Sequence, residues 1–378
     1  MLAPMAELSH RPLRELLENF GGCDFFFTEM ISASAFCAGG PFEEWYADAG
    51  PKPEKTVYQL VGSEPEKLAA AAFLLDQREC AGIDINMGCS APAITRTGAG
   101  VRWMESPDRA ASMISLVRKS VKRRLSVKLR IGLKDDFPYL INFCKRLEGE
   151  GVEMITLHPR TAKEKFRRNC RWDYIPALRR ELKIPVTGNG DISSAEEMIR
   201  RGEQCDAVMI GRLAVRQPWV FARAKELVRE EVHAEAQRRG GAEVGKEKKE
   251  EEEEGEKRDF SGRFRAEAQG RRGAEVGKGK NEEEEEREEE REVEEEKRKG
   301  KEKEEERLVL ETGVKFLELL ARYQPVEFHL SRARRFFHYF CDNLKWGNFL
   351  KNQLNREPDL AGIERVWMDY FSEHKGEV

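Results

Sequence analysis

The stretch IDINMGC, residues 83–89, shows the pattern that decides the fold of the first 232 residues. A short, largely apolar run ends in polar and glycine residues, and a helix-compatible stretch follows. Such near-continuous apolar runs are typical of parallel strands that are buried on both faces. Eight of them lie at residues 1–5, 25–30, 56–61, 83–88, 126–131, 154–158, 184–188 and 207–211.

Helix-compatible stretches separate these runs, among them residues 65–78, 107–121, 137–150 and 194–201. Strand and helix patterns that alternate in this way predict an α/β fold with a parallel sheet. Eight strand-then-helix units within residues 1–232 favour a (β/α)₈ TIM barrel, which typically takes roughly 250 residues. A doubly wound open sheet is the alternative, because the same alternation permits it.

Residues 233–307 differ from the rest of the chain in composition. Residues 234–307 hold 21 Lys and Arg side chains and 28 Asp and Glu side chains, so the remainder of the chain has a small net positive charge. The segment 234–254 recurs at 266–286 with 17 of 21 positions identical. This repeat has almost no apolar residues that stacked copies would bury. We therefore expect a charged low-complexity insert that is disordered or forms a solvated helix.

Residues 308–378 return to a globular pattern, with apolar residues such as Phe316 and Leu320 at helical spacing. This pattern predicts a small all-α domain after the barrel and the insert. Its segment RARRFFH, residues 332–338, combines cations with aromatic rings, which suits binding to a nucleic-acid backbone. Arg332, Arg334 and Arg335 are the candidate contacts.

The composition also argues against several classes of protein. The eight cysteines include no CxxC pair, which disfavours a disulfide framework or a zinc site, and we expect no metal. Residues 1–12 lack the apolar core of a signal peptide, and no apolar run reaches about 18 residues, so we expect no membrane association. We expect a cytoplasmic protein that acts as a monomer.

Polar, glycine or proline groups follow or end all eight expected strands. In TIM barrels this rim carries the active site. The groups are Ala3-Pro4-Met5, Thr28-Glu29-Met30, Gln59, Asn86-Met87-Gly88-Cys89, Lys128 with Arg130, His158-Pro159-Arg160-Thr161, Gly188-Asn189-Gly190-Asp191 and Gly211-Arg212.

Three of these groups suggest anion binding. Glycines at 188, 190 and 211 let backbone N–H groups approach a phosphate, and helices that begin after Ser193 and Arg212 would add their positive ends. Lys128 and Arg130 are two residues apart on a strand and point to the same face, where inward cations need an anion. The alternative for Lys128 is a surface position on the helix-facing side.

Cys89 lies in a Gly-Cys-Ser-Ala-Pro turn near the rim. Thiols are largely protonated at neutral pH and can act as general acids. A free cysteine is more often a small buried residue, however, and the residue pattern alone gives Cys89 no advantage over Cys23 or Cys205.

A series of stretches within residues 1–222 carries a more specific signal: APMAELSHRPLREL, TEMISA, VYQLVGSEPEKLAAAA, IDINMGCSAPAITRTGAG, VKLRIG, ITLHPRT, IPVTGNGDI and AVMIGRLAVRQPWVF. In these stretches the chain resembles the tRNA-dihydrouridine synthase family. The later stretch FHLSRARRFFHYF resembles the start of that family's helical RNA-binding domain.

The resemblance implies an FMN-carrying barrel, a helical domain that binds tRNA, and reduction of a tRNA uridine to 5,6-dihydrouridine. The hydride would come from FMN that NADPH or NADH has reduced. The family's acid cysteine falls on Cys89, and a position near the target base falls on Asn86. Its FMN contacts fall on Ala3, Pro4, Met5, Gln59, Lys128, His158, Asn189, Gly190, Asp191, Gly211 and Arg212.

Two other functions remain open. One is an FMN-barrel oxidoreductase that acts on a free pyrimidine, similar to dihydroorotate dehydrogenase; such an enzyme has no need of the arginine-rich helical tail. The other is a tRNA-binding homologue with impaired catalysis, because Ser90 and Arg168 depart from the usual family pattern.

Overall fold

The computed structural model describes residues 1–165, 167–234 and 279–373. Its centre is a parallel sheet with the strand order β1-β2-β3-β4-β5-β6-β7. The strands are β1 (Phe26–Ser32), β2 (Thr56–Val61), β3 (Gly82–Met87), β4 (Arg124–Gly132), β5 (Met154–Thr161), β6 (Val186–Asn189) and β7 (Ala207–Met209). Sequential order with parallel pairing throughout is the arrangement of a TIM barrel and differs from a doubly wound sheet.

The segment at residues 1–5 closes the sheet into a ring without forming a full strand. Leu2 makes parallel bridges to Phe26, the first residue of β1, and to Ile210, which directly follows β7. The prediction of eight complete strands was therefore wrong at its first member. Pro4 has no N–H for a sheet partner, and the Met5 backbone instead pairs with Ser9, whose Oγ accepts from Met5 N at 2.8 Å.

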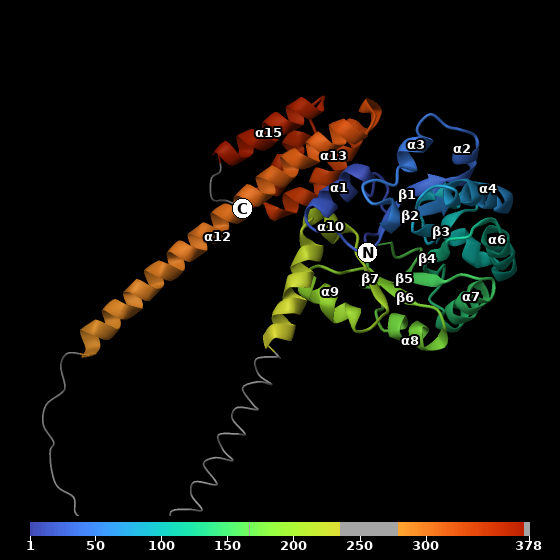
Figure 1. The fold of residues 1–378 in the computed structure, drawn as a ribbon, viewed down its shortest axis with the longest axis horizontal. Helices are drawn as coiled ribbons and strands as arrows, with labels where there is room; N and C mark the ends of the chain where they lie inside the picture. Colours follow the sequence, from blue (N-terminus) through green and yellow to red (C-terminus); the bar gives the residue numbers. More distant parts are fainter. Residues whose placement is uncertain (166, 235–278, 374–378) are drawn as a thin grey trace, which may run out of the picture. The chain divides into compact units, whose positions relative to one another are not determined.

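Helices surround the strands in Figure 1. The longer ones are α1 (Arg11–Asn19), α4 (Pro65–Asp76), α6 (Pro107–Ser120), α7 (Phe137–Gly149), α8 (Tyr174–Glu181) and α9 (Ala195–Gly202). The short ones are α2 (Ala33–Cys37), α3 (Glu43–Tyr46), α5 (Pro92–Thr95) and α10 (Arg212–Arg216), with 3₁₀ turns at Pro53–Lys55 and Gly100–Glu105. Apolar side chains that point outward from the strands, such as Ile83, Ile85 and Met87, pack in one continuous core with α4 and α6 residues.

The C-terminal helices are α12 (Gly279–Tyr323), α13 (Val326–Phe340), α14 (Gly347–Leu354) and α15 (Leu360–Glu373), with a 3₁₀ turn at Cys341–Asn343. Their core is aromatic: the rings of Phe316 and Phe336 stack at 3.7 Å, and Trp367 donates its Nε1–H to Leu310 O at 3.0 Å. Gly313 permits this packing, because a Cβ there would lie 2.4 Å from the Trp367 ring. The predicted TIM barrel with an all-α domain is confirmed.

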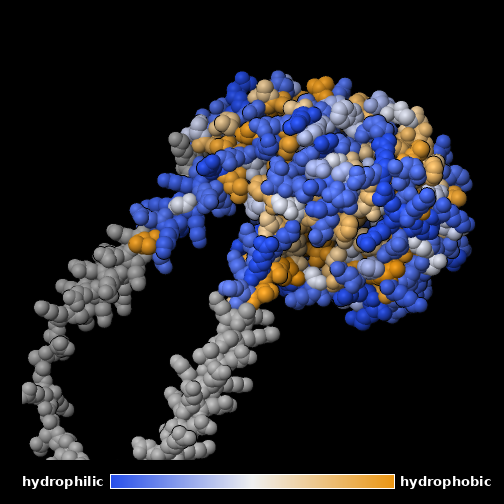
Figure 2. Space-filling view, viewed as in Figure 1, coloured by the Kyte–Doolittle hydropathy of each residue, from blue (hydrophilic) through white to orange (hydrophobic). Residues whose placement is uncertain are grey.

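The barrel and the helices from residue 309 onward form one compact unit, and the described residues between 225 and 308 fall outside it. The part of the insert at 235–278 lies outside the described residues, and from Gly279 onward the insert is helical. Side chains at 293–305 are exposed. Hydrophilic side chains cover most of the face seen in Figure 2, and within the described ranges no helix has an apolar run long enough to cross a membrane.

Candidate active site

A cavity of about 340 Å³ opens at the carboxyl ends of the strands. Its volume lies in the range that small-molecule sites of proteins occupy, roughly 300–1,000 Å³. The cavity is lined by the N-terminal segment, by β1, by the ends of β3 to β7, by α10 and by α13. The predicted residues that line it are Ala3, Pro4, Met5, Asn86, Cys89, Lys128, His158, Asn189, Gly190, Asp191, Gly211, Arg212 and Arg335.

Three predicted site residues lie elsewhere. Gln59 is fully buried on β2 and donates from Nε2 to Asp84 Oδ2 at 2.7 Å. Arg334 is half-buried and donates from Nη2 to the Glu357 carbonyl at 2.9 Å.

The third is Arg332, which was expected at the surface as a phosphate contact and is only 1 % exposed. Its Nη2 lies 2.8 Å from Glu29 Oε2 on β1, and its guanidinium stacks over the Phe328 ring at 4.3 Å. Arg332, Phe336 and Phe340 share the buried stripe of α13, which explains the burial.

Cys89 is half-buried at the cavity in a turn that side-chain and backbone contacts define. Asn86 Oδ1 accepts from the N–H groups of Gly88 at 3.2 Å and Cys89 at 2.9 Å. On the other side, Val101 N donates to Cys89 O at 3.0 Å. Gly100 has φ +63°, and a Cβ there would lie 2.4 Å from Cys89 O, so glycine is required for this close approach.

Cations and a neutral imidazole face the same cavity. Lys128 donates from Nζ to Asn189 Oδ1 at 2.9 Å, and Asn189 is itself held by a bond from Nδ2 to Met209 O at 2.8 Å. Burial, together with nearby Arg130, lowers the pKa of Lys128 to about 8. Burial first, and then the charges of Lys128 and Arg130, lower the pKa of His158 far below its usual range, so its ring is neutral at physiological pH.

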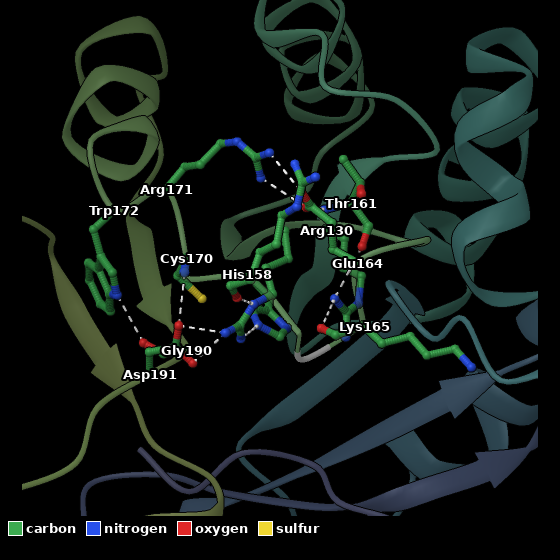
Figure 3. A network of polar contacts seen from close by, with 12 residues as sticks. Arg130, His158, Thr161, Glu164, Lys165, Cys170, Arg171, Trp172, Gly190 and Asp191 are labelled. Carbon is green, nitrogen blue, oxygen red and sulfur yellow. Dashed lines mark hydrogen bonds and ion pairs between the residues drawn. The ribbon is translucent and has the colours of Figure 1, made fainter.

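A polar network anchors one wall of the cavity (Figure 3). Arg160 Nη2 contacts both carboxylate oxygens of Asp191, at 2.6 and 2.7 Å, and its Nη1 lies 3.2 Å from His158 Nε2. Asp191 Oδ2 also accepts from Cys170 N at 2.8 Å, and Trp172 Nε1 donates to Gly190 O at 2.9 Å. Burial alone would raise the pKa of Asp191, but the Cys170 N–H and the Arg160 guanidinium outweigh it and lower that pKa.

Hydrogen bonds and ion pairs also hold the loop that follows β5 on this side of the cavity. Glu164 accepts from both terminal nitrogens of Arg171, at 2.7 and 2.9 Å, and from Thr161 N at 2.8 Å. The Arg171 hydrogen bonds lower the pKa of Glu164 to about 2. Arg130 donates from Nη1 to Lys165 O at 3.1 Å, and the Lys165 side chain points away from the network in Figure 3. Arg168, which departs from the family pattern, lies on this loop with its side chain 76 % exposed.

The phosphate site was expected after strands seven and eight, at the start of two helices. One of these helices, α9, does not suit an anion. Side chains of the same segment cap the amino end of helix α9. Ser194 accepts a hydrogen bond from Glu197 N, and the Glu197 carboxylate accepts one from Ser193 N at 2.9 Å. Its first turn is acidic, which disfavours an anion there. The cavity instead borders Gly211 and Arg212, where a Cβ on Gly211 would lie 3.2 Å from Met5 Sδ.

Eleven residues that line the cavity were not among the predicted cofactor, base or tRNA contacts, and they include Met30, Arg130, Arg160 and Tyr339. The sequence held a usable signal for three of these four. Arg130 and Arg160 each lie two positions beyond a predicted site residue on the same strand, and Tyr339 lies four positions beyond Arg335 on a helix. Within the described ranges, no group of three or more His, Cys, Asp or Glu side chains is arranged to hold a metal ion.

The sequence of the chain is similar to those of one enzyme family. The family described as dihydrouridine synthase matches residues 1–311. A probable tRNA-dihydrouridine synthase of Rhizobium leguminosarum is 34 % identical over 240 residues, which cover 61 % of this chain and 74 % of the relative. One from Aquifex aeolicus is 32 % identical over 233 residues (60 % and 72 %). The tRNA-dihydrouridine synthase B of Pasteurella multocida is 30 % identical over 236 residues (60 % and 69 %). The chain therefore belongs to the dihydrouridine synthase family of oxidoreductases.

Proposed function

We propose that the protein is an FMN-dependent tRNA-dihydrouridine synthase, which reduces the C5=C6 bond of specific tRNA uridines to 5,6-dihydrouridine. The observation that carries the proposal is one cavity that Cys89 lines together with Lys128, His158 and Arg212. Its relatives in Rhizobium leguminosarum and Aquifex aeolicus, described as tRNA-dihydrouridine synthases, support tRNA as the substrate.

The donors around the cavity suit FMN, which has a planar polar ring and a phosphate. Lys128, Arg130, Arg160 and Arg212 give the cavity a cationic lining. A lowered lysine pKa rises again when an anion binds, so an electron-rich ring edge beside Lys128 Nζ would stabilise its protonated form. Gly211 and Arg212 would hold the phosphate, with Ala3, Pro4 and Met5 along one side of the ligand.

When bound, FMN would supply the hydride that reduces the uracil ring, after NADPH or NADH has reduced it. The residues of the chain have three tasks around that step. Lys128 holds positive charge at the cofactor, and the neutral His158 ring donates or accepts one hydrogen bond. Asn86, whose carbonyl is occupied by the Cys89 turn, lines the space that a uracil ring would enter.

The second carbon of the reduced bond needs a proton, and Cys89 Sγ is the group we assign to deliver it. The neutral His158 ring is a poor acid, because its pKa is far below physiological pH. The Lys128 ammonium donates one of its three N–H groups to Asn189 Oδ1 at 2.9 Å, and giving up a proton would remove the positive charge that it holds at the cofactor. A uridine inside a folded tRNA would have to leave its stack to reach this cavity.

The helical domain favours tRNA over a free pyrimidine. Arg335, which is exposed, and Tyr339 reach the cavity from α13, so a second domain contributes to the wall. A cation and an aromatic ring at the entrance suit the phosphate and base of a nucleotide that remains attached to a larger RNA. A small free substrate would gain nothing from that domain.

The test is an assay of the purified, FMN-loaded full chain with NADPH or NADH on two substrates. We expect dihydrouridine in bulk tRNA that lacks the modification, measured by mass spectrometry of nucleosides, and no turnover of orotate or dihydroorotate. Turnover of the free pyrimidine with untouched tRNA would refute the proposal. A yellow protein that oxidises NADPH but modifies neither substrate would refute it equally.

A further inference from the structure

A row of buried polar side chains joins three neighbouring strands inside the barrel. Gln59 on β2, Asp84 on β3 and Ser126 on β4 lie opposite one another in the sheet register. Gln59 and Asp84 have no exposed surface, and Ser126 has 5 %. A buried carboxyl is unfavourable unless hydrogen bonds satisfy it, so its partners have a structural purpose.

The hydrogen bonds of this row lead from Asp84 to the backbone of Cys89. Ser126 Oγ donates to Asp84 Oδ1 at 2.6 Å, and Gln59 Nε2 donates to Asp84 Oδ2 at 2.7 Å. Asn86 Nδ2 donates to Gln59 Oε1 at 2.9 Å. Asn86 Oδ1 then accepts from Cys89 N at 2.9 Å. Asn86 and Cys89 line the cavity, whereas Asp84 and Gln59 do not.

The two ends of this chain of hydrogen bonds fix the direction of both amides. An ionised carboxylate can only accept hydrogen bonds, and a backbone N–H can only donate. Gln59 must therefore turn its nitrogen toward Asp84 and its oxygen toward Asn86. Asn86 must in turn offer its nitrogen to Gln59 and its oxygen to Cys89 N. A reversal of either amide would bring two donors or two acceptors face to face.

We propose that Asp84 is a positioning residue, which orients Gln59 and Asn86 and thereby holds the turn that presents the Cys89 thiol to the cavity. The inference rests on the proposed role of Cys89 as the proton donor. Burial raises the pKa of Asp84 to about 6, and the hydrogen bonds from Ser126 and Gln59 oppose that rise. The carboxyl is thus mostly ionised at neutral pH and acts as the acceptor that this arrangement requires.

Two substitutions separate orientation from charge. Asp84→Leu keeps the branched shape of the side chain, has a larger volume, and removes the acceptor for Gln59. Asp84→Asn removes the charge but can keep an oxygen toward Gln59, because Ser126 Oγ can accept the new amide N–H. Thr156→Val is the matched control: Thr156 on β5 is also fully buried, and its hydroxyl has no hydrogen-bond partner among the described residues.

The primary measurement is amide hydrogen exchange at Cys89 in the FMN-free full chain, resolved by NMR or by fragmentation mass spectrometry. We expect the Cys89 amide to exchange roughly tenfold faster in Asp84→Leu, the equivalent of one lost hydrogen bond. It should keep the rate of the unmodified chain in Asp84→Asn and in Thr156→Val. Equal protection in Asp84→Leu, or equal loss in Asp84→Asn, would overturn the proposal.

Gln59→Met serves if Asp84→Leu does not fold, because it breaks the same connection while Asp84 keeps Ser126. It should expose the Cys89 amide in the same way, and unchanged protection would overturn the proposal. In the loaded enzyme, kcat for dihydrouridine formation should fall in Asp84→Leu relative to Asp84→Asn by on the order of 10²-fold, with an equal KM for tRNA. Equal kcat values in the two variants would also overturn it.

The exchange measurement separates this inference from the function that we propose. Full activity of Cys89→Ala would remove the assigned proton donor, yet the Cys89 amide would still report whether Asp84 holds the turn. Conversely, an inactive Cys89→Ala together with an unaltered amide in Asp84→Leu would leave the function standing and exclude the positioning role.

Discussion

Removing either charge of the buried pair between Arg332 and Glu29 should destabilise the protein, with a different pH dependence in each case. Both side chains are nearly inaccessible, 2 % and 3 % exposed, with 2.8 Å between Nη2 and Oε2. Glu29 Oε1 also accepts from Glu7 N at 2.6 Å. Burial raises the pKa of Glu29 above its usual value even though Arg332 and Arg14 oppose the rise.

Breaking a buried ion pair on one side typically costs about 3–5 kcal/mol, because one charge stays behind without compensation. In Glu29→Gln the guanidinium of Arg332 cannot lose its proton, so we expect a loss of this size near pH 5 that does not grow toward pH 8. In Arg332→Met the Glu29 carboxyl has lost its partner, but it can take up a proton and become neutral. Its folded-state pKa then rises further above the unfolded value.

The sign of the pH dependence follows from that rise. A carboxyl whose pKa is raised on folding stabilises the protein below its unfolded pKa, and this stabilisation disappears as the pH climbs through the folded pKa. The loss in Arg332→Met should therefore be small near pH 5 and grow toward pH 8, by at most about 1.4 kcal/mol per pH unit. The double variant Glu29→Gln/Arg332→Met should recover a large share of the loss.

The assay is urea unfolding of the FMN-free full chain, followed by circular dichroism at several pH values. Lys315→Met is the matched control in the same helical domain, because its 3.0 Å contact with Glu318 is exposed and should contribute less than about 1 kcal/mol. A loss in Arg332→Met that is the same at pH 5.5 and pH 8 would refute this reasoning. So would a double variant that is less stable than both single ones.

Four further outcomes test the site and the insert. Cys89→Ala should keep FMN and tRNA affinity but slow dihydrouridine formation by about 10²–10⁴-fold in a single-turnover assay, and unchanged turnover would remove the assigned acid. Lys128→Ala should weaken FMN retention or slow its reduction, as flavin absorbance and stopped-flow traces would show; full occupancy with normal reduction would exclude that role. Arg335→Ala should raise KM for tRNA and lower the salt slope by about one, whereas an unaltered slope would place Arg335 away from the phosphates. Deletion of 234–307 should leave the melting temperature and activity largely intact, and a collapse in thermal stability would show that the insert is structural.

The sequence predicted the barrel and much of the cavity lining for a physical reason. Parallel strands in a closed ring bring their carboxyl ends to one rim, so residues such as Cys89, Lys128 and Gly211 had to meet once the strands were recognised. The first strand was predicted to be too long. Residues 1–5 have an apolar composition typical of a strand, but Pro4 cannot donate a backbone hydrogen bond to a neighbouring strand.

The arginines of α13 show where sequence reasoning stopped. Arg332 and Arg335 look alike in the run RARR, and cations are usually exposed. Helical spacing separates them: Arg332 aligns with Phe336 and Phe340 on the buried stripe, whereas Arg335 aligns with Tyr339 at the cavity. Asp84 was missed for another reason. A strand buried on both faces does not show which of its faces turns inward.

The bridges of Leu2 close the barrel between its first and last segments. Because the closure joins residue 2 to residue 210, the barrel stays open during synthesis until more than 200 residues have emerged. Ala3 to Met5 lie on one side of this closure, and Gly211 and Arg212 lie on the other. Residues from both sides line the cavity. A ligand that contacts both sides would hold them together. We therefore expect the protein without ligand to open first between residues 2 and 210, and the ligand-bound protein to resist opening there.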